Sequence, residues 1–228
     1  MRLGCLFSGG KDSTYALYKS LKEGHEVPCI ISLHPFNDES LLYHYPNNLL
    51  LKKISEAIEI PIIERYCNNT LKEHEIDQLI SSIRQAIEEY SIEGLINGAI
   101  SSRFQLNIFQ KICTDLNLKL YSPIWEIDPC KYYNQLINSQ FEIIITRVAA
   151  LGLDKIWLGK TINERNYESL DILSKKFKFN ITFEGGEAET LVIDCPIYKK
   201  KIKIVRSKIQ WDGIRGTFEI LDVVLIRK

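Results

Sequence analysis

The residues near the start of the chain that are best suited to chemistry form the segment Ser8-Gly9-Gly10-Lys11-Asp12-Ser13. Two adjacent glycines let the backbone turn tightly and bring its N–H groups against a ligand. Lys11 adds a full positive charge, Ser8 and Ser13 add hydroxyl groups, and a helix that begins here adds the partial positive charge of its N-terminus. These groups together predict a loop that binds an anion, and phosphate is the natural candidate. Residues 8–13 are called the phosphate loop below.

The spacing of the phosphate loop excludes two familiar nucleotide-binding patterns. Gly4 and Gly9 are separated like the glycines of a Walker A loop, but Gly10 stands where the lysine of that pattern should follow. The segment is not a G-x-G-x-x-G dinucleotide pattern either. A Gly-Gly turn with only a structural role is the alternative, and the position of the whole segment between a predicted strand and a predicted helix favours the anion site.

A second group of unusual residues is Glu184-Gly185-Gly186-Glu187-Ala188-Glu189, in which three carboxylates surround a Gly-Gly turn. The apolar run that follows predicts a strand. If the chain is extended from Glu187 onward, Glu187 and Glu189 point to the same face. Such a pair could bind magnesium, receive an amine or act as a general base, and a solvated acidic turn is the alternative. Residues 184–189 are called the acidic turn below.

The charge of the chain argues against several functions. Its 228 residues include 29 Lys and Arg against 29 Asp and Glu, so the cationic excess typical of nucleic-acid or membrane binders is missing. A basic cluster late in the chain is expected to be a solvated strand and turn, with a local basic groove as the alternative. It comprises Lys199, Lys200, Lys201, Lys203, Arg206 and Lys208.

The cysteines and the apolar runs indicate a compartment. The six cysteines lie singly, without a CxxC pair or zinc-ligand spacing, which indicates reducing surroundings and no structural zinc. No run of about 18 apolar residues could span a membrane, and the apolar run at the N-terminus is too short for a signal peptide. We therefore expect a cytoplasmic protein.

The elements that must position the phosphate loop alternate along most of the chain. Buried strands are expected at residues 2–7, 27–33, 61–66, 94–97, 118–122 and 141–148. Helices are expected at residues 12–23, 47–58, 71–90, 103–116 and 129–139. Because apolar strands alternate with helices, the pattern predicts an α/β fold with a mostly parallel sheet that helices cover on both faces.

The pattern changes near residue 150. A helix expected at residues 164–177 is followed by strand patterns at residues 190–194, 199–209 and 216–226. Asp212-Gly213 is a turn signal between the last two strands. We therefore expect two parts, residues 1–148 and a smaller α+β portion at residues 149–228.

The phosphate loop resembles the pyrophosphate-binding loop of the N-type ATP pyrophosphatases, the PP-loop superfamily, which cleaves ATP to AMP and pyrophosphate. The resemblance implies a Rossmann-like, doubly wound sheet of the adenine nucleotide alpha hydrolase kind, with the ligand at the carboxyl ends of the strands. It makes residues 1–148 the ATP-binding domain and residues 149–228 the substrate-binding portion.

Further segments resemble one family of this superfamily, the diphthine–ammonia ligases. The acidic turn, with Thr190-Leu191 and Asp194-Cys195-Pro196 after it, looks like the signature of that family. Other segments similar to the family follow in order along nearly the whole chain. They are Tyr43-His44, Gly98-Ala99-Ile100-Ser101-Ser102, Ser122-Pro123-Ile124-Trp125, Ala149-Ala150-Leu151-Gly152-Leu153-Asp154 and Trp157-Leu158-Gly159-Lys160.

The resemblance implies a ligase that uses ATP to convert diphthine, a modified histidine of elongation factor 2, to diphthamide. Ammonium would supply the nitrogen, and an acyl-adenylate would form before AMP and pyrophosphate are released. ATP and Mg²⁺ are the implied cofactors, and elongation factor 2 is the implied protein partner. Neither stable nucleic acid nor a membrane is expected as a partner, and a homodimer is left open.

The resemblance also implies roles for individual residues. The catalytic residues would be Lys11, Asp12, Glu187 and Glu189. ATP would be bound by Ser8, Gly9, Gly10, Lys11, Asp12, Ser13, His44 and Gly98, and Mg²⁺ by Asp12. The substrate and ammonium would be bound by Glu184, Gly185, Gly186, Glu187 and Ser102. Lys11 is expected to be exposed at the start of its helix.

Two other functions stay open. Another PP-loop enzyme, such as a tRNA-modifying sulfur or amine transferase, usually needs paired reactive cysteines or net basicity, and the sequence shows neither. The third candidate is a protein that binds ATP without catalysis. The nucleotide and macromolecular products distinguish all three.

Overall fold

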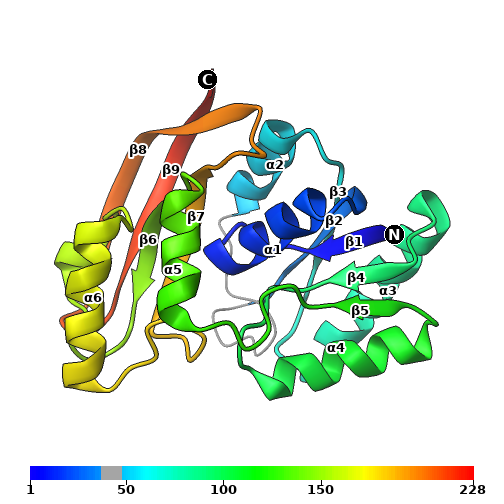
Figure 1. Cartoon of the computed structure of the whole chain (residues 1–228), viewed down its shortest axis with the longest axis horizontal. Coiled ribbons are helices and arrows are strands. Elements are labelled where there is room, and N and C mark those ends of the chain that lie inside the picture. Colours follow the sequence, from blue (N-terminus) through cyan, green and yellow to red (C-terminus); the bar gives the residue numbers. More distant parts are fainter. Residues whose placement is uncertain (37–47) are drawn as a thin grey trace. The chain divides into compact units, whose positions relative to one another are not determined.

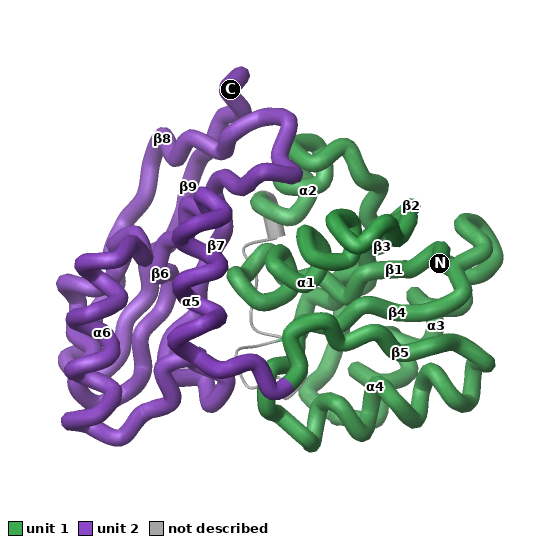
Figure 2. Tube along the Cα trace, in the orientation of Figure 1, with its two compact units in different colours: residues 1–125 green, residues 126–228 purple. Residues whose placement is uncertain are grey.

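The computed structural model describes residues 1–36 and 48–228, which form two compact units, Met1–Trp125 and Glu126–Lys228 (Figure 2). This division differs from the expected boundary after residue 148. Helix α5 (Pro129–Asn138) and strand β6 (Glu142–Val148) were expected to complete the first part, but they belong to unit 2. The reason is strand pairing, because β6 pairs with β7 (Ala188–Asp194) and not with the parallel sheet.

Unit 1 is a parallel five-stranded sheet with helices on its faces, which confirms the predicted α/β fold (Figure 1). Its strands are β1 (Arg2–Leu6), β2 (Glu26–His34), β3 (Ile62–Tyr66), β4 (Gly94–Ile96) and β5 (Lys119–Tyr121). Its helices are α1 (Lys11–Lys22), α2 (Asn48–Ile58), α3 (Lys72–Tyr90) and α4 (Arg103–Asp115).

The strand order β3-β2-β1-β4-β5 makes the sheet doubly wound. From β1 the chain proceeds outward through β2 and β3, and it then returns to the other side of β1 for β4 and β5. The connections that follow β1 and β4 therefore diverge, and this reversal is the switch point at which open α/β sheets bind ligands, beyond the carboxyl ends of the strands.

The core of unit 1 explains the apolar strands and the helical periodicity. Ile31 of β2 and Leu95 of β4 are completely buried, because helices cover the sheet on both sides. Helix α3 presents Leu79, Ile83 and Ala86 to the same cluster, and their spacing of four and three residues follows one face of a helix. The core thus holds the ends of β1 and β4 in fixed positions.

Unit 2 is a four-stranded sheet of order β7-β6-β9-β8 with two helices, which agrees with the expected α+β portion. Its other elements are the short 3₁₀ helix η1 (Lys155–Trp157), α6 (Glu164–Phe177), β8 (Lys200–Trp211) and β9 (Gly216–Arg227). All strand pairs are antiparallel. The apolar run of β6 did not reveal this, because a buried strand has the same pattern in parallel and antiparallel sheets.

Strands β8 and β9 join at the predicted Asp-Gly turn. Oδ1 of Asp212 accepts hydrogen bonds from the backbone N–H groups of Arg215 and Ile214, both at 2.8 Å. Gly213 has a φ of 104°, which an L-residue with a side chain rarely adopts. The hydrogen bonds from Arg215 and Ile214 lower the pKa of Asp212 from its usual value. In the described part of the chain, no helix has the length and apolar character needed to cross a membrane.

Candidate functional site

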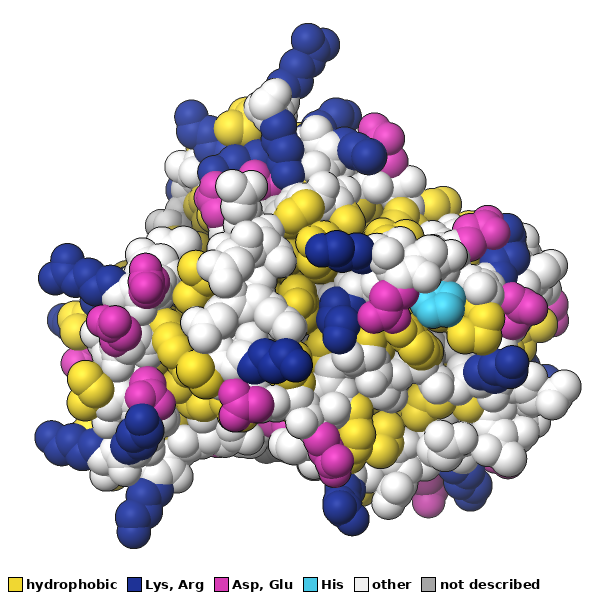
Figure 3. All heavy atoms as spheres, viewed as in Figure 1, with side chains coloured by type: hydrophobic (Ala, Val, Ile, Leu, Met, Phe, Trp, Pro, Cys, Tyr) yellow, Lys and Arg dark blue, Asp and Glu magenta, His cyan; other side chains and the backbone are white. Residues whose placement is uncertain are grey.

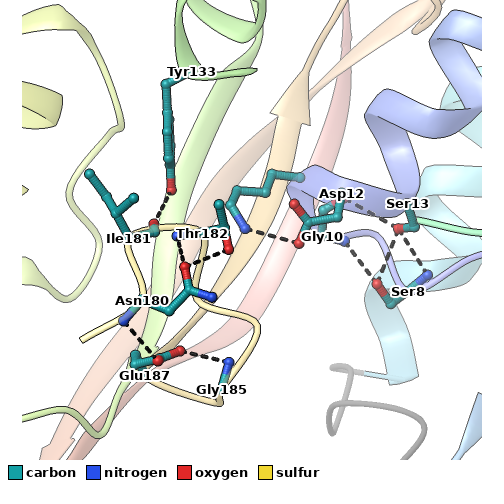
Figure 4. Close-up of polar contacts among 11 residues, drawn as sticks. Ser8, Gly10, Asp12, Ser13, Tyr133, Asn180, Ile181, Thr182, Gly185 and Glu187 are labelled. Atoms are coloured by element: carbon teal, nitrogen blue, oxygen red, sulfur yellow. Dashed lines mark hydrogen bonds and ion pairs between the residues drawn. The ribbon is translucent and has the colours of Figure 1, made fainter. Parts of the chain in front are cut away.

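The phosphate loop follows the carboxyl end of β1, as the sequence predicts, and its last three residues form the start of α1 (Figure 4). Gly9 has a φ of 77°, in the left-handed region that glycine enters without steric cost. Gly10 is the N-cap of α1, and because it has no side chain, no side-chain hydrogen bond caps this helix. The N–H groups in the first turn of α1 therefore have no side-chain cap, which is the arrangement that binds anions at helix N-termini in other proteins.

The two serines of the phosphate loop hold its turn together. The hydroxyl oxygens of Ser8 and Ser13 lie 3.1 Å apart, and the backbone N–H of Ser8 donates to the Ser13 hydroxyl at 3.2 Å. The Ser8 hydroxyl also accepts a hydrogen bond from the backbone N–H of Gly10 at 3.4 Å. The hydroxyl groups proposed to contact phosphate thus lie together on the inner side of the turn.

Lys11 is buried, and the expectation that it is exposed was wrong. Its side chain is 2% exposed, and its Nζ atom lies 2.9 Å from Oδ2 of Asp12. The charge predicted at the start of α1 is present, and it is held beside a carboxylate. A buried ammonium needs such a partner, because burial of an unpaired charge costs several kcal/mol, roughly, even after relaxation.

Gly98, after β4, lies against the start of α1. A Cβ atom at this position would lie 2.7 Å from the backbone nitrogen of Ser13 and 2.8 Å from the carbonyl carbon of Asp12. Both contacts are to backbone atoms, so only glycine permits this approach. The pairing of β4 with β1 brings the two segments together, as the switch point requires.

Asn97 fixes the segment that contains Gly98, and the sequence reasoning missed it. This buried side chain donates from Nδ2 to the hydroxyl of Ser122 at 2.7 Å, and its Oδ1 accepts from the backbone N–H of Ala99 at 3.0 Å. Ser102 is the N-cap of α4, where its hydroxyl accepts from the backbone N–H of Gln105 at 3.4 Å. The one available signal for Asn97 was an amide directly after a short central strand.

Two expectations for unit 1 find no structural support. His44, expected to bind ATP, lies outside the described residues. Within residues 1–36 and 48–228, no group of three or more His, Cys, Asp or Glu is arranged to hold a metal ion. Asp12 stays the residue predicted to bind Mg²⁺.

The acidic turn in unit 2 is organised by the carboxylate of Glu187 (Figure 4). Its Oε2 accepts from the backbone N–H of Gly185 at 2.8 Å, and its Oε1 accepts from the backbone N–H of Asn180 at 3.0 Å. A Cβ atom on Gly185 would lie 2.6 Å from Oε1 of this carboxylate, so a side chain at this position would require Glu187 to shift. Strand β7 begins at Ala188, so Glu187 precedes it, and the conditional prediction that Glu187 and Glu189 share one face of an extended segment does not apply.

Glu189 has a different environment from Glu187. It lies opposite Arg147 in the pairing of β7 with β6, and Nη1 of Arg147 lies 3.0 Å from its Oε1. The two side chains are 13% and 21% exposed, so the ion pair is largely buried. Sequence reasoning missed Arg147, because its proximity to Glu189 depends on a strand pairing that the sequence did not predict.

Further residues that the sequence reasoning missed hold the segment before the acidic turn. Oδ1 of Asn180 accepts from both the backbone N–H of Thr182, at 3.0 Å, and its hydroxyl, at 2.8 Å. The hydroxyl of Tyr133 on α5 donates to the carbonyl oxygen of Ile181 at 2.8 Å. Gly186 has a φ of 81°, so the turn itself needs a glycine there. Hydrogen bonds therefore hold both the acidic turn and the segment before it.

The comparisons with known proteins cover both units. A family model described as the diphthamide synthase N-terminal domain matches residues 1–120, and one described as the C-terminal domain matches residues 128–226. A solved structure described as a predicted subunit of a tRNA methyltransferase from Methanocaldococcus jannaschii covers 86% of this chain and 98% of its own. Its sequence identity of 16% and TM-score of 0.45 are too low to support a statement about fold or function.

Relatives named diphthine–ammonia ligase match over most of the chain. The protein from Rattus norvegicus is 33% identical, and the match covers 91% of this chain and 84% of the relative. The protein from Homo sapiens is 30% identical, and the match covers 92% of this chain and 85% of the relative. That from Schizosaccharomyces pombe is 31% identical, covering 92% of this chain and 37% of a longer protein. As its resemblance implied, the chain belongs to the diphthamide synthase family.

Proposed function

We propose that this chain is a cytoplasmic diphthine–ammonia ligase that uses ATP to amidate diphthine on elongation factor 2. The observation that carries the proposal is the phosphate loop at the carboxyl end of β1, in a chain whose two units both match the diphthamide synthase family. The relatives named above carry this activity in their names, and it is an activity that forms a C–N bond.

The chemistry requires an activated carboxylate. The carboxylate of diphthine does not react with ammonia until it gains a leaving group. In the proposed reaction a carboxylate oxygen attacks the α-phosphorus of ATP, and the bond from that phosphorus to the β-phosphate bridging oxygen breaks. Ammonia then attacks the carbonyl carbon of the acyl-adenylate, AMP leaves, and the nitrogen loses a proton. The products are the amide, AMP and pyrophosphate.

The residues around the phosphate loop fit the role of holding ATP. The N-terminus of α1 carries no side-chain cap, and two serine hydroxyls and the Lys11 ammonium lie on the same turn. These groups would bind the β- and γ-phosphates and stabilise the negative charge that develops on departing pyrophosphate. Gly98, which contacts the first turn of α1, would let the nucleotide lie close to the backbone.

Asp12 is the residue that we propose for Mg²⁺. This ion usually retains several waters and is held by one or two carboxylates together with phosphate oxygens, so a single aspartate is sufficient. In the structure the Asp12 carboxylate pairs with Lys11 at 2.9 Å. Binding of a magnesium–ATP complex would provide both partners with new counter-charges, the metal for Asp12 and a phosphate for Lys11.

The acidic turn is the proposed site for ammonium and for the proton that it loses. Glu184, Glu187 and Glu189 would supply the carboxylates, and Glu187 and Glu189 have different contacts in the structure. Glu187 binds two backbone N–H groups and so shapes the turn, whereas Glu189 is held by Arg147. We therefore expect loss of Glu189 to affect proton transfer directly, and loss of Glu187 to act also through the shape of the turn.

The test is incorporation of labelled nitrogen into the acceptor. Elongation factor 2 that carries diphthine is incubated with the protein, ATP, Mg²⁺ and ¹⁵N-ammonium, and the modified peptide is analysed by mass spectrometry. Conversion of the carboxylate to a ¹⁵N-amide that depends on ATP supports the proposal. Unchanged diphthine under conditions in which the protein is folded and binds ATP would refute it.

A further inference from the structure

The charge of the chain is balanced overall but unevenly distributed. Residues 199–228 contain nine Lys and Arg and three Asp and Glu, a net charge of +6. Because the whole chain has 29 of each kind, residues 1–198 carry a net charge of −6. Nearly all of the basic segment lies in β8 and β9, which are called the C-terminal ribbon below. Figure 3 shows Lys and Arg side chains gathered around the end of the ribbon that carries the C-terminus.

The C-terminal ribbon departs from the rest of its sheet. Strand β9 pairs with β6 only through Arg147 with Thr217 and Val148 with Gly216. Farther along β6 the neighbouring position is occupied by residues 159–162, since the backbone N–H of Ile145 donates to the carbonyl oxygen of Lys160 at 2.9 Å. Beyond its first residues, β9 therefore has β8 as its strand partner, and β8 forms the edge of the sheet.

One face of the ribbon combines basic and apolar side chains. Lys203 lies opposite Val224 and Arg206 lies opposite Asp222, so all four are on the same face, because Val224 and Asp222 are two residues apart on β9. The irregular register between Ile204 and Arg206 makes this alignment possible. Lys203 and Arg206 are exposed, and Val224 is 43% exposed.

Internal ion pairs neutralise only part of the ribbon. Lys201 pairs with Glu142 at 2.5 Å, Lys208 with Glu219 at 3.0 Å, and Lys228 with Asp194 at 2.5 Å. Two of the three carboxylates, Glu142 and Asp194, lie outside residues 199–228. When these two are added to the acidic residues of the segment, Lys and Arg still outnumber Asp and Glu. The ribbon therefore presents a positive potential that attracts an acidic partner.

We propose that the C-terminal ribbon is the surface that docks the acceptor protein, through an acidic region of that protein. This inference rests on the proposed function, since it concerns the macromolecule that this family modifies. Lysines on an edge strand also prevent aggregation, but that role does not explain apolar side chains such as Val205, which is 55% exposed. A basic surface steers an acidic partner into contact, and the exposed apolar side chains beside the charges can then be buried against that partner.

A second copy of the chain does not fit the same surface. Strand β8 carries five Lys and Arg and no Asp or Glu, so pairing of two β8 edges would bring like charges together. Like charges across neighbouring strands are destabilising. Nucleic acid is the other polyanion that could bind this basic surface, and binding of bulk tRNA is the opposing outcome of the experiment.

The test compares two double variants of equal net charge. Lys203→Glu with Arg206→Glu reverses two charges on the ribbon, and Lys111→Glu with Lys119→Glu reverses two exposed lysines in unit 1 as the control. Steady-state amidation is measured against elongation factor 2 concentration at low and high salt, with circular dichroism as the check of folding. If reversal prevents folding, Lys203→Gln with Arg206→Gln replaces it.

We expect the ribbon variant to raise KM for the acceptor about tenfold at low salt, with kcat at saturation and ATP affinity unchanged. The difference should shrink at high salt, and the control should behave like the wild type. An unchanged KM in an active ribbon variant overturns the inference and leaves the proposed function standing. An unchanged KM together with lost binding of bulk tRNA assigns the surface to nucleic acid. A folded wild type that fails to amidate refutes the proposed function, and this inference with it.

Discussion

Gly98→Ala tests whether the close approach of the β4 segment to α1 shapes the ATP site. The added Cβ would meet the backbone nitrogen of Ser13 at 2.7 Å and the carbonyl carbon of Asp12 at 2.8 Å. Comfortable contact needs about 3.5 Å, so the first turn of α1 must move by roughly 0.8 Å. Overpacking of this kind costs about 1–3 kcal/mol, which for a chain of this size lowers Tm by roughly 2–12 °C.

The same displacement moves the phosphate loop, and this is the part of the prediction that concerns function. Misplacement of a binding group by about 1 Å can cost on the order of 10²-fold in rate. We therefore expect ATP affinity, measured by calorimetry well below Tm, to fall by about 10- to 100-fold. Gly4→Ala is the matched control on the neighbouring strand, where the Cβ would meet only side-chain atoms, the nearest being Cδ1 of Ile92 at 3.0 Å. It should lower Tm and leave ATP affinity unchanged. Normal ATP affinity in a folded Gly98→Ala protein would refute the reasoning.

Four further predictions concern single residues. Lys11→Ala should lower ATP affinity at least about tenfold while a cooperative melting transition is retained, and a collapsed transition would instead assign Lys11 to the fold. Glu187→Gln replaces one hydrogen-bond acceptor of the acidic turn by a donor. Limited proteolysis near Gly185 should therefore accelerate, and amidation should fall by about 10²-fold. An unchanged rate of proteolysis would contradict the structural role of Glu187. The low pKa of Asp212 stabilises the fold above the pKa of the unfolded chain, and this contribution is lost as pH falls through the lowered pKa. Wild type and Asp212→Asn should therefore differ in Tm at neutral pH and converge in acid, and a constant difference would contradict this. A thiol reagent at pH 8 should modify only Cys130 in the native protein, because the other five cysteines are buried, and it should modify all six after denaturation. Rapid modification of a second thiol in the native protein would disprove this prediction.

Burial explains why those five thiols should be inert. It raises the pKa of Cys29 and that of Cys195 to about 12, and that of Cys113 to about 11. In the sequence, four of the six cysteines lie beside apolar residues, a pattern that predicts small core residues. The structure agrees, since Cys130 is the one exposed cysteine among the six.

The fold of unit 1 was predictable because its signals are local. Apolar runs such as that of β2 and the four- and three-residue spacing of α3 follow directly from burial on a covered sheet. The phosphate loop was predictable for the same reason, since its glycines and its helix start are adjacent in the sequence. The place of β6 was not predictable, because its pairing with β7 joins residues 40 to 52 positions apart, from Val148 with Ala188 to Glu142 with Asp194, and the pattern of neither strand indicates its partner.

The environment of the candidate site residues depended on similar long-range contacts. Sequence spacing would place Glu187 and Glu189 on one face if the chain were extended from Glu187, but it could not show that Glu187 binds the backbone of Asn180. Nor could it show that β6 brings Arg147 to Glu189. The role of Asn97 could not be predicted for the same reason, because its hydrogen-bond partner Ser122 lies beyond the next helix and strand in the sequence. Side chains that organise a site through such contacts have no local signature.

The nucleotide products of the acceptor-dependent reaction test the central claim most directly. Chromatography of the reaction with ATP, Mg²⁺, ammonium and diphthine-bearing elongation factor 2 separates AMP from ADP. The phosphate loop lacks the Walker A lysine position, and the proposed attack is at the α-phosphorus, so AMP and pyrophosphate should appear in step with the amide. Accumulation of ADP and phosphate in step with the amide would contradict the assignment of this loop and the mechanism built on it.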